Sequence, residues 1–351
     1  MSGDHVVEER IRELATEVGV ELPPVRVSGD DPVLPSVFHV GTAAAIAVGA
    51  ATAAAAALRG GGSRAAVDVR EAAISFLDER HFRIDGAAVD LWAPLSGDYR
   101  TADGWVRLHC NFDHHRDAAL AGLGLSADTG RDAVERACAG RTAVEVEGAV
   151  TAAGGCAAAM RDRAGWREHP QSRAVAGSPL VHLTRLGAPG GVRDLGSVRD
   201  PGGGGTGAPK GGGGRALDGV RVLDLTRVIA GPVATRTLAA HGAQVLRVGA
   251  GHLPEVPGLV IGTAFGKRSC HLDLRTPAGI SALHDLVAGA DVFVQSYRPG
   301  ALEALGFGPR RLAEIRPGIV CVDISAYGGA GAVGGQARVR QPGADGVRHR
   351  P

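Results

Sequence analysis

The chain has 351 residues, enough for two domains with separate cores, and it carries 38 Lys and Arg against 37 Asp and Glu. This balance gives no net field that favours nucleic acid or an anionic membrane surface, and 4% aromatic residues argue against base stacking. Scattered cysteines without C-x-x-C or His spacing predict reduced, buried thiols in a cytoplasmic protein without a metal, although a catalytic cysteine stays open. The five are Cys110, Cys138, Cys156, Cys270 and Cys321.

The chain opens with an acidic, amphipathic stretch over 1–21, unlike a signal peptide, and a helix is expected over 6–18. A loop with four prolines follows. Residues 40–58 carry no charge and are long enough to span a bilayer, but they are mostly alanine. We therefore expect a buried helix over 42–58 in a soluble protein that does not bind membranes.

The next part of the chain mixes short strands and helices. Tyr99 to Leu108 reads as a hairpin around the turn Asp103-Gly104. The other expected elements are strands over 66–69 and 156–159 and helices over 71–77, 116–123, 132–138 and 144–153. These elements predict a smaller α/β domain.

A glycine-rich stretch, P-G-G-G-G-T-G-A-P-K-G-G-G-G, covers 201–214. Such runs lose much backbone entropy on ordering and behave as flexible linkers. Lys210 is followed by Gly211, so the G-K-[ST] pattern of a phosphate-binding loop is absent.

After the linker, apolar strands alternate with helices. Strands are expected over 220–224, 244–248, 292–295 and 319–324, with helices over 232–241, 277–288 and 310–315. Alternation at this spacing predicts an α/β fold with a Rossmann-like parallel sheet and flanking helices.

Five blocks after the linker carry a family resemblance. They are L-D-G-V-R-V-L-D-L-T-R-V-I-A-G-P (217–232), H-G-A-Q-V-L-R-V (241–248), G-K-R-S-C-H-L-D-L-R-T-P-A-G (266–279), A-D-V-F-V-Q-S-Y-R-P-G-A-L-E-A-L-G (290–306) and V-D-I-S-A-Y-G (322–328). In this order they resemble the early part of class III (CaiB/BaiF-type) CoA-transferases.

The first half of the chain resembles the later part of the same family. The resemblance lies in the alanine-rich helix with A-A-V-D-V-R-E-A (65–72), in the Asp103-Gly104-Trp105 hairpin and in W-R-E-H-P-Q-S-R (166–173). We therefore expect a late, small-domain-like part over 1–200, a linker over 201–216, an early CoA-binding part over 217–335 and an atypical tail over 336–351. This order is permuted, or it is the remnant of a tandem fusion.

The resemblance implies that coenzyme A or acyl-CoA and a carboxylic acid are substrates. In the family, an aspartate attacks the thioester and CoA moves through an enzyme-bound thioester to the acceptor. The positions that match CoA contacts are Val228, Ile229, Leu272, Leu274, Arg275, Ser296, Tyr297, Arg298, Ala301 and Tyr327. Lys267 and Arg268 are expected to be structural or to face a phosphate, and Val248-Gly249-Ala250 lacks the basic residue of many relatives.

The largest departure from the family follows Gly335. The family's Phe-Asp or Tyr-Asp pair, which supplies the nucleophile, has no counterpart, so no catalytic residue is assigned. Asp345 is the only carboxylate in the tail, and its neighbours do not fit. One choice of codons for 337–350, read one base later, spells Arg-Gly-Phe-Asp-Ser-Leu, which suggests a frameshift.

Two alternatives stay open. An α-methylacyl-CoA racemase-like enzyme would need a base, for which His39, His109, His114 and His115 are candidates, although surface histidines are the default. A non-catalytic CoA-binding subunit could pair with a complete relative. The family's interlocked dimers imply a homo-oligomer.

Overall fold

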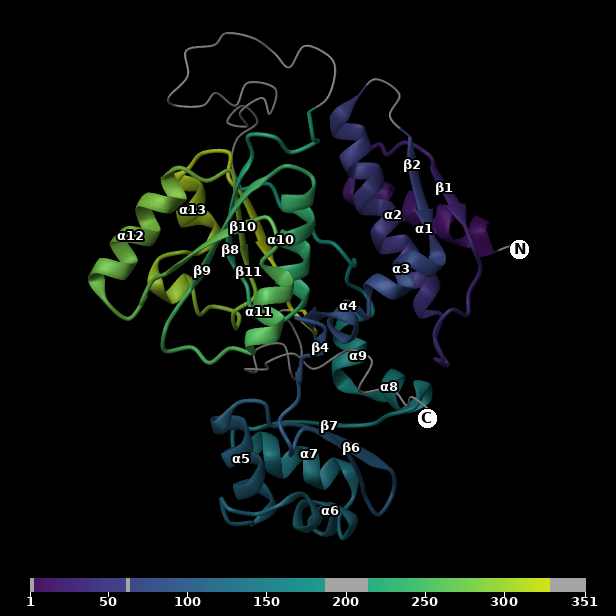
Figure 1. The fold of residues 1–351 in the computed structure, drawn as a ribbon, viewed down its shortest axis with the longest axis vertical. Helices are drawn as coiled ribbons and strands as arrows, with labels where there is room; N and C mark the ends of the chain where they lie inside the picture. The colour runs from purple at the N-terminus through teal and green to yellow at the C-terminus, as the bar shows by residue number, and fades with distance from the viewer. Residues whose placement is uncertain (1–2, 61–63, 187–213, 329–351) are drawn as a thin grey trace. The chain divides into compact units, whose positions relative to one another are not determined.

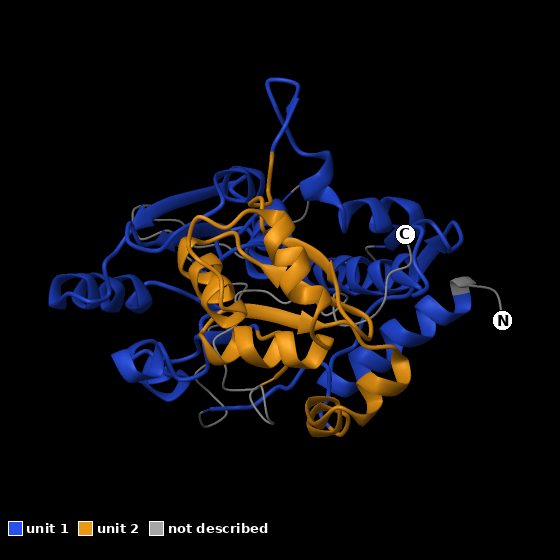
Figure 2. Ribbon diagram, turned by 90° about the horizontal axis from the view of Figure 1, so that it is seen from below, with its two compact units in different colours: residues 1–89, 178–324 blue, residues 90–177, 325–351 orange. Residues whose placement is uncertain are grey.

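The computed structural model describes residues 3–60, 64–186 and 214–328. The chain forms two compact units, one of residues 1–89 with 178–324 and one of 90–177 with 325–351 (Figure 2). Each unit therefore contains residues from both sides of the expected linker. The linker stretch 201–213 and the tail lie outside the described residues.

The start of the first unit is a small βαβ arrangement. Strands β1 and β2 pair in parallel, and helix α2 connects them and packs against α1. Gly49 of α2 sits where a Cβ atom would lie 2.8 Å from Cδ1 of Ile11. Small residues thus let α2 approach its neighbours closely. The bounds are α1 Gly3–Val18, β1 Val25–Ser28, α2 Val40–Arg59, β2 Ala65–Asp68, α3 Val69–Ser75, α4 Asp78–His81, β3 Arg83–Ile84 and β4 Ala87–Ala88.

Helix α2 is the one helix in the described ranges that is long and apolar enough to cross a membrane. Its inward residues, among them Ala44, Ala45 and Ala53, are fully buried against Ile11 and Val67. One side of α2 therefore packs into the core of the first unit, and 39% of its apolar 18-residue window is buried.

The second unit contains a three-stranded antiparallel sheet in the order β5-β6-β7. Its core joins Tyr99 and Leu108 of the sheet to Leu120 and Val146 of the helices. A capping box between Thr142 and Glu145 starts α7. The bounds are β5 Gly97–Arg100, β6 Trp105–His109, α5 Asp113–Leu123, α6 Arg131–Ala139, α7 Ala143–Ala152, β7 Cys156–Ala159, α8 Arg163–Glu168 and α9 Pro170–Val175.

The largest sheet has five parallel strands in the order β10-β9-β8-β11-β12. Its strands and helices follow one another along residues 221–323. The bounds are β8 Arg221–Leu225, α10 Ala230–Ala240, β9 Gln244–Gly249, α11 Pro257–Thr263, β10 Lys267–His271, α12 Pro277–Ala288, β11 Val292–Gln295, η2 Glu303–Leu305, α13 Pro309–Ile315 and β12 Val320–Asp323.

Both faces of this sheet are covered by helices. Alternate residues of β8 point to opposite sides: Val222 packs with Ala239 of α10, whereas Leu223 packs with Leu283 of α12 and Leu312 of α13. In Figure 1, α10 lies along one side of the strands and α12 and α13 along the other. The predicted Rossmann-like sheet with flanking helices is confirmed.

Sequence patterns located most elements to within a few residues. They missed β1, whose residues lie in a segment expected to be a loop, and β10, an edge strand whose K-R-S-C-H pattern has exposed polar residues at Arg268, Ser269 and His271. The short elements were also missed: the helices α4, α8, α9 and α11, the 3-10 helix η2 and the strands β3 and β4. Each has seven residues or fewer, too few to display a period.

Candidate functional site

Nine of the ten residues matched to CoA contacts share one topological position in the first unit. Each of the nine lies in a segment that follows the carboxyl end of a parallel strand: two after β8, three after β10 and four after β11. The tenth, Tyr327, follows β12 but belongs to the second unit. Strand order reverses between β8 and β11, because β9 and β10 extend to one side and β11 and β12 to the other. Open α/β sheets bind ligands in the crevice at this point.

The segment after β8 has an unusual backbone. Val228 has φ of +72°, a left-handed conformation that costs a β-branched residue energy. The backbone N–H of the preceding Arg227 donates to Oγ of Ser296 at 3.3 Å. The loops on either side of the switch point are therefore tied together, and both contain candidate residues.

A buried ion pair lies directly beneath this loop. Nζ of Lys267 is 2.9 Å from Oδ2 of Asp224, and the two side chains are 1% and 0% exposed. Burial lowers the pKa of Lys267, and the carboxylate of Asp224 opposes that shift. Lys267 is thus structural, one of the two roles expected for it, whereas Arg268 is exposed.

The segment after β11 is fixed by side-chain to backbone bonds. Oε1 of Gln295 accepts from the N–H of Tyr297 at 2.7 Å, and Nε2 of Gln295 donates to Asp323 at 2.6 Å. Tyr297 is half-buried, and burial raises the pKa of its phenol. Arg298 is exposed, and its carbonyl accepts from Ala301 in a turn.

The segment after β10 combines packing with charge. Leu272 and Leu274 are partly buried against the sheet's core, so they have a packing role in any case. Arg275 is exposed and donates twice to the carboxylate of Asp273, at 2.8 and 2.7 Å. These hydrogen bonds hold the pKa of Asp273 well below its usual range.

Two arginines near this edge, neither among the ten matched residues, contact the segment after β9. Arg247 is buried and pairs with Glu255, and the Arg227 guanidinium donates to the carbonyl of Pro254. No basic residue directly follows Val248, and the side chain of the preceding Arg247 is paired with Glu255. A pattern of alternation within β9 would have placed Arg247 in the strand but not revealed its partner.

Tyr327 belongs to the second unit. Its carbonyl accepts from Nε2 of the fully buried Gln171 at 2.7 Å, and its ring centroid is 6.0 Å from that of Trp166. The W-R-E-H-P-Q-S-R block therefore contacts the A-Y-G turn, although more than 150 residues separate them. Sequence reasoning recognised both blocks but had no signal for their contact.

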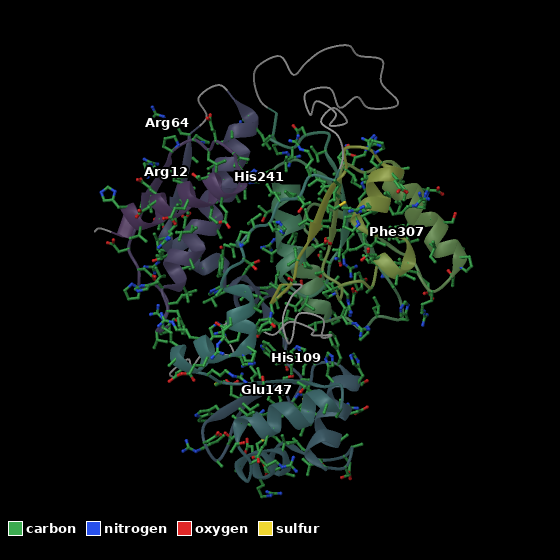
Figure 3. The ribbon with its side chains drawn as sticks, turned by 180° about the vertical axis from the view of Figure 1, so that it is seen from behind. Arg12, Arg64, His109, Glu147, His241 and Phe307 are labelled. Atoms are coloured by element: carbon green, nitrogen blue, oxygen red, sulfur yellow. The ribbon has the colours of Figure 1, made fainter. Side chains whose placement is uncertain are left out.

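Three of the four histidines considered as bases gather in the second unit. The ring centroids of His114 and His115 are 4.1 Å apart, and the ring of His109 is 5.8 Å from that of His115. His109 is the last residue of β6 (Figure 3). His115 is buried and close to Cys156, with 3.8 Å between Nε2 and Sγ. His39 is exposed beside Asp31.

Three of the described cysteines are poor nucleophiles. Burial raises the pKa of Cys110 to about 12, and that of Cys138 and of Cys321 to about 11. Within residues 3–60, 64–186 and 214–328 no group of three potential metal ligands occurs. Asp345 lies outside these ranges. Among the described residues, the carboxyl edge of the five-stranded sheet therefore has candidate binding groups, and no nucleophile is assigned there.

Comparison with known proteins finds a family match in the second half of the chain. The model of "CoA-transferase family III" matches residues 217–349. Human succinyl-CoA:glutarate CoA-transferase is 38% identical over 135 residues, which are 35% of this chain and 31% of that protein. A Brucella suis CAIB/BAIF family protein of known structure is 30% identical, covers 36% of this chain and 37% of its own, and gives a TM-score of 0.32.

A fungal relative aligns over a longer stretch. The acyl-CoA transferase of Gibberella moniliformis is 30% identical over 250 residues, which cover 66% of this chain and 41% of that protein. The aligned stretch covers two thirds of the chain, which is more than the part of the chain that follows residue 216. The alignment therefore also includes residues well before the linker. The chain spans about a third of the human relative's length and two fifths of the fungal one's.

Proposed function

Because residues 217–349 belong to CoA-transferase family III, we propose that the chain binds coenzyme A or acyl-CoA at the carboxyl edge of its five-stranded sheet. The observation that carries the proposal is that the nine matched residues of the first unit follow the carboxyl ends of parallel strands, with the strained Val228 at the switch point. The reaction class is transfer of CoA between an acyl-CoA and a carboxylic acid.

Arg275 provides the test of the binding edge, because an exposed guanidinium suits a phosphate. We expect Arg275→Ala to weaken CoA binding about three- to fivefold in a calorimetric titration of the full chain. Arg215→Ala is the matched control. Both arginine side chains are 65% exposed and both pair with an aspartate, but Arg215 precedes β8 at the amino end of the sheet. Equal effects of the two variants would argue against this edge.

The catalytic step is a separate question from binding. We propose that the chain lacks the family's nucleophilic aspartate, so it should bind CoA without exchanging it between an acyl-CoA and a labelled carboxylate. The family match extends through residue 349 and includes Asp345. Exchange that disappears in Asp345→Asn, with a CoA thioester on that residue by mass spectrometry, would contradict the proposal.

The gene itself tests the frameshift. An extra base near the codon for residue 335, with Arg-Gly-Phe-Asp in the following frame, would restore the family's continuation. A confirmed tail would leave a CoA-binding subunit that pairs with a complete relative or with its own copy, in the cytoplasm as the reduced thiols suggest.

The order of the parts is also proposed. A late family segment followed by an early one is what the junction of two tandem family units would contain. The length of the fungal alignment supports this order, since one continuous match spans the linker.

A further inference from the structure

We propose that Lys267 and Asp224 are positioning residues that hold the loop from Thr226 to Gly231 in the shape that binds CoA, without touching the ligand. The inference rests on the proposed function of this edge. The pair is buried, with Asp224 on β8 and Lys267 on β10, and neither residue is among the ten matched to CoA contacts.

Neither side chain can reach a bound ligand. Both are essentially unexposed, and the three N–H bonds of the Lys267 ammonium are directed to acceptors inside the protein. They go to Asp224 at 2.9 Å, to the carbonyl of Pro232 at 2.8 Å and to Oγ1 of Thr235 at 2.7 Å. Any effect of the pair on binding must therefore pass through neighbouring residues.

Asp224 connects the pair to the loop. Its Oδ1 accepts from the backbone N–H of Thr226 at 3.0 Å and from the Thr226 hydroxyl at 2.5 Å. Its Oδ2 accepts from Thr235, one turn into α10, at 2.6 Å. The carboxylate thus fixes the loop where it leaves β8 and also where it enters the helix.

The loop between these two anchors is strained and tightly packed. Val228 has its left-handed backbone here, and a Cβ atom on Gly231 would lie 2.3 Å from Cβ of Thr226. A strained conformation persists only where its surroundings over-determine it. The ion pair and its two threonines supply that constraint.

The test replaces the pair by apolar residues of similar size. Asp224→Leu with Lys267→Met removes both charges together, so neither is left buried alone, and such replacements often preserve stability. We expect the full-length double variant to stay folded, to bind CoA about tenfold more weakly by calorimetry and to exchange the amide hydrogens of 226–231 faster. Asp291→Leu with Arg316→Met, an ion pair that precedes β11 and β12, should leave CoA binding unchanged.

We call the Lys267–Asp224 pair with its hydrogen bonds to Thr226 and Thr235 the clamp. The outcomes of the test separate the clamp from the proposal that this edge binds CoA. Unchanged exchange at 226–231 in the double variant would overturn the clamp, whether or not CoA binds. Failure of the native chain to bind CoA would overturn the proposed function, and the exchange rates would still decide the clamp. If the double variant does not fold, Thr226→Val removes one anchor and should give the same faster exchange, while Thr226→Ser should not.

Discussion

Lys267→Met alone is expected to lower the free energy of unfolding by about 3–5 kcal/mol, because it leaves the carboxylate of Asp224 buried without its counter-charge. All three tryptophans, Trp92, Trp105 and Trp166, lie in the second unit, so their fluorescence does not report on this sheet. Native-state hydrogen exchange of the β8 and β9 amides is the suitable measurement.

The matched control is the double variant with Asp224→Leu, which should recover most of the lost stability. A Lys267→Met protein as stable as the native chain would mean that Asp224 is protonated or hydrated without cost. The free energies of unfolding expected for the two outcomes differ by more than the error of a hydrogen-exchange measurement.

Gly279→Ala is expected to lower the free energy of unfolding by about 1–3 kcal/mol and to weaken CoA binding. A Cβ atom at this position would lie 2.1 Å from the carbonyl oxygen of Asp273, which is backbone and cannot turn away. The backbone of Asp273 would have to move away from the new Cβ atom. This shift would displace the segment after β10, from Leu272 to Arg275. Exchange of the α12 amides measures the first effect and calorimetry the second.

Gly148→Ala is the corresponding control. Gly148 lies in the middle of α7, is exposed and has nothing within 4 Å of a new Cβ atom. Alanine has the higher helix propensity, so this variant should gain up to about 1 kcal/mol. Loss of stability at both positions would show that helix position, rather than the contact with Asp273, determines the effect.

Sequence patterns sufficed for the parallel sheet because its central strands are short apolar runs bounded by helix signals. The edge strand β10 was missed since only a fully buried strand needs an apolar run, and the exposed Arg268 and Ser269 fit an edge. The resemblance supplied the candidate residues, and nine of them, all in the first unit, follow strands of one parallel sheet at its carboxyl edge.

Contacts between distant segments could not be predicted. Lysine side chains are usually exposed, so the sequence gives no reason to expect that Lys267 is buried. It also gives no reason to expect that Lys267 pairs with Asp224, 43 residues earlier. Likewise Gln171 and Tyr327 lie in two recognisable blocks, but their hydrogen bond depends on how the chain returns to the second unit.

The most direct test of the account is hydrogen exchange of the full chain with and without saturating CoA. We predict slower exchange in the segments after β8, β10 and β11, at 226–231, 272–276 and 296–301, and no change at 217–220 or 289–291 at the opposite edge. Binding of CoA without protection of these three segments, or with protection confined to 90–177, would contradict the proposed site.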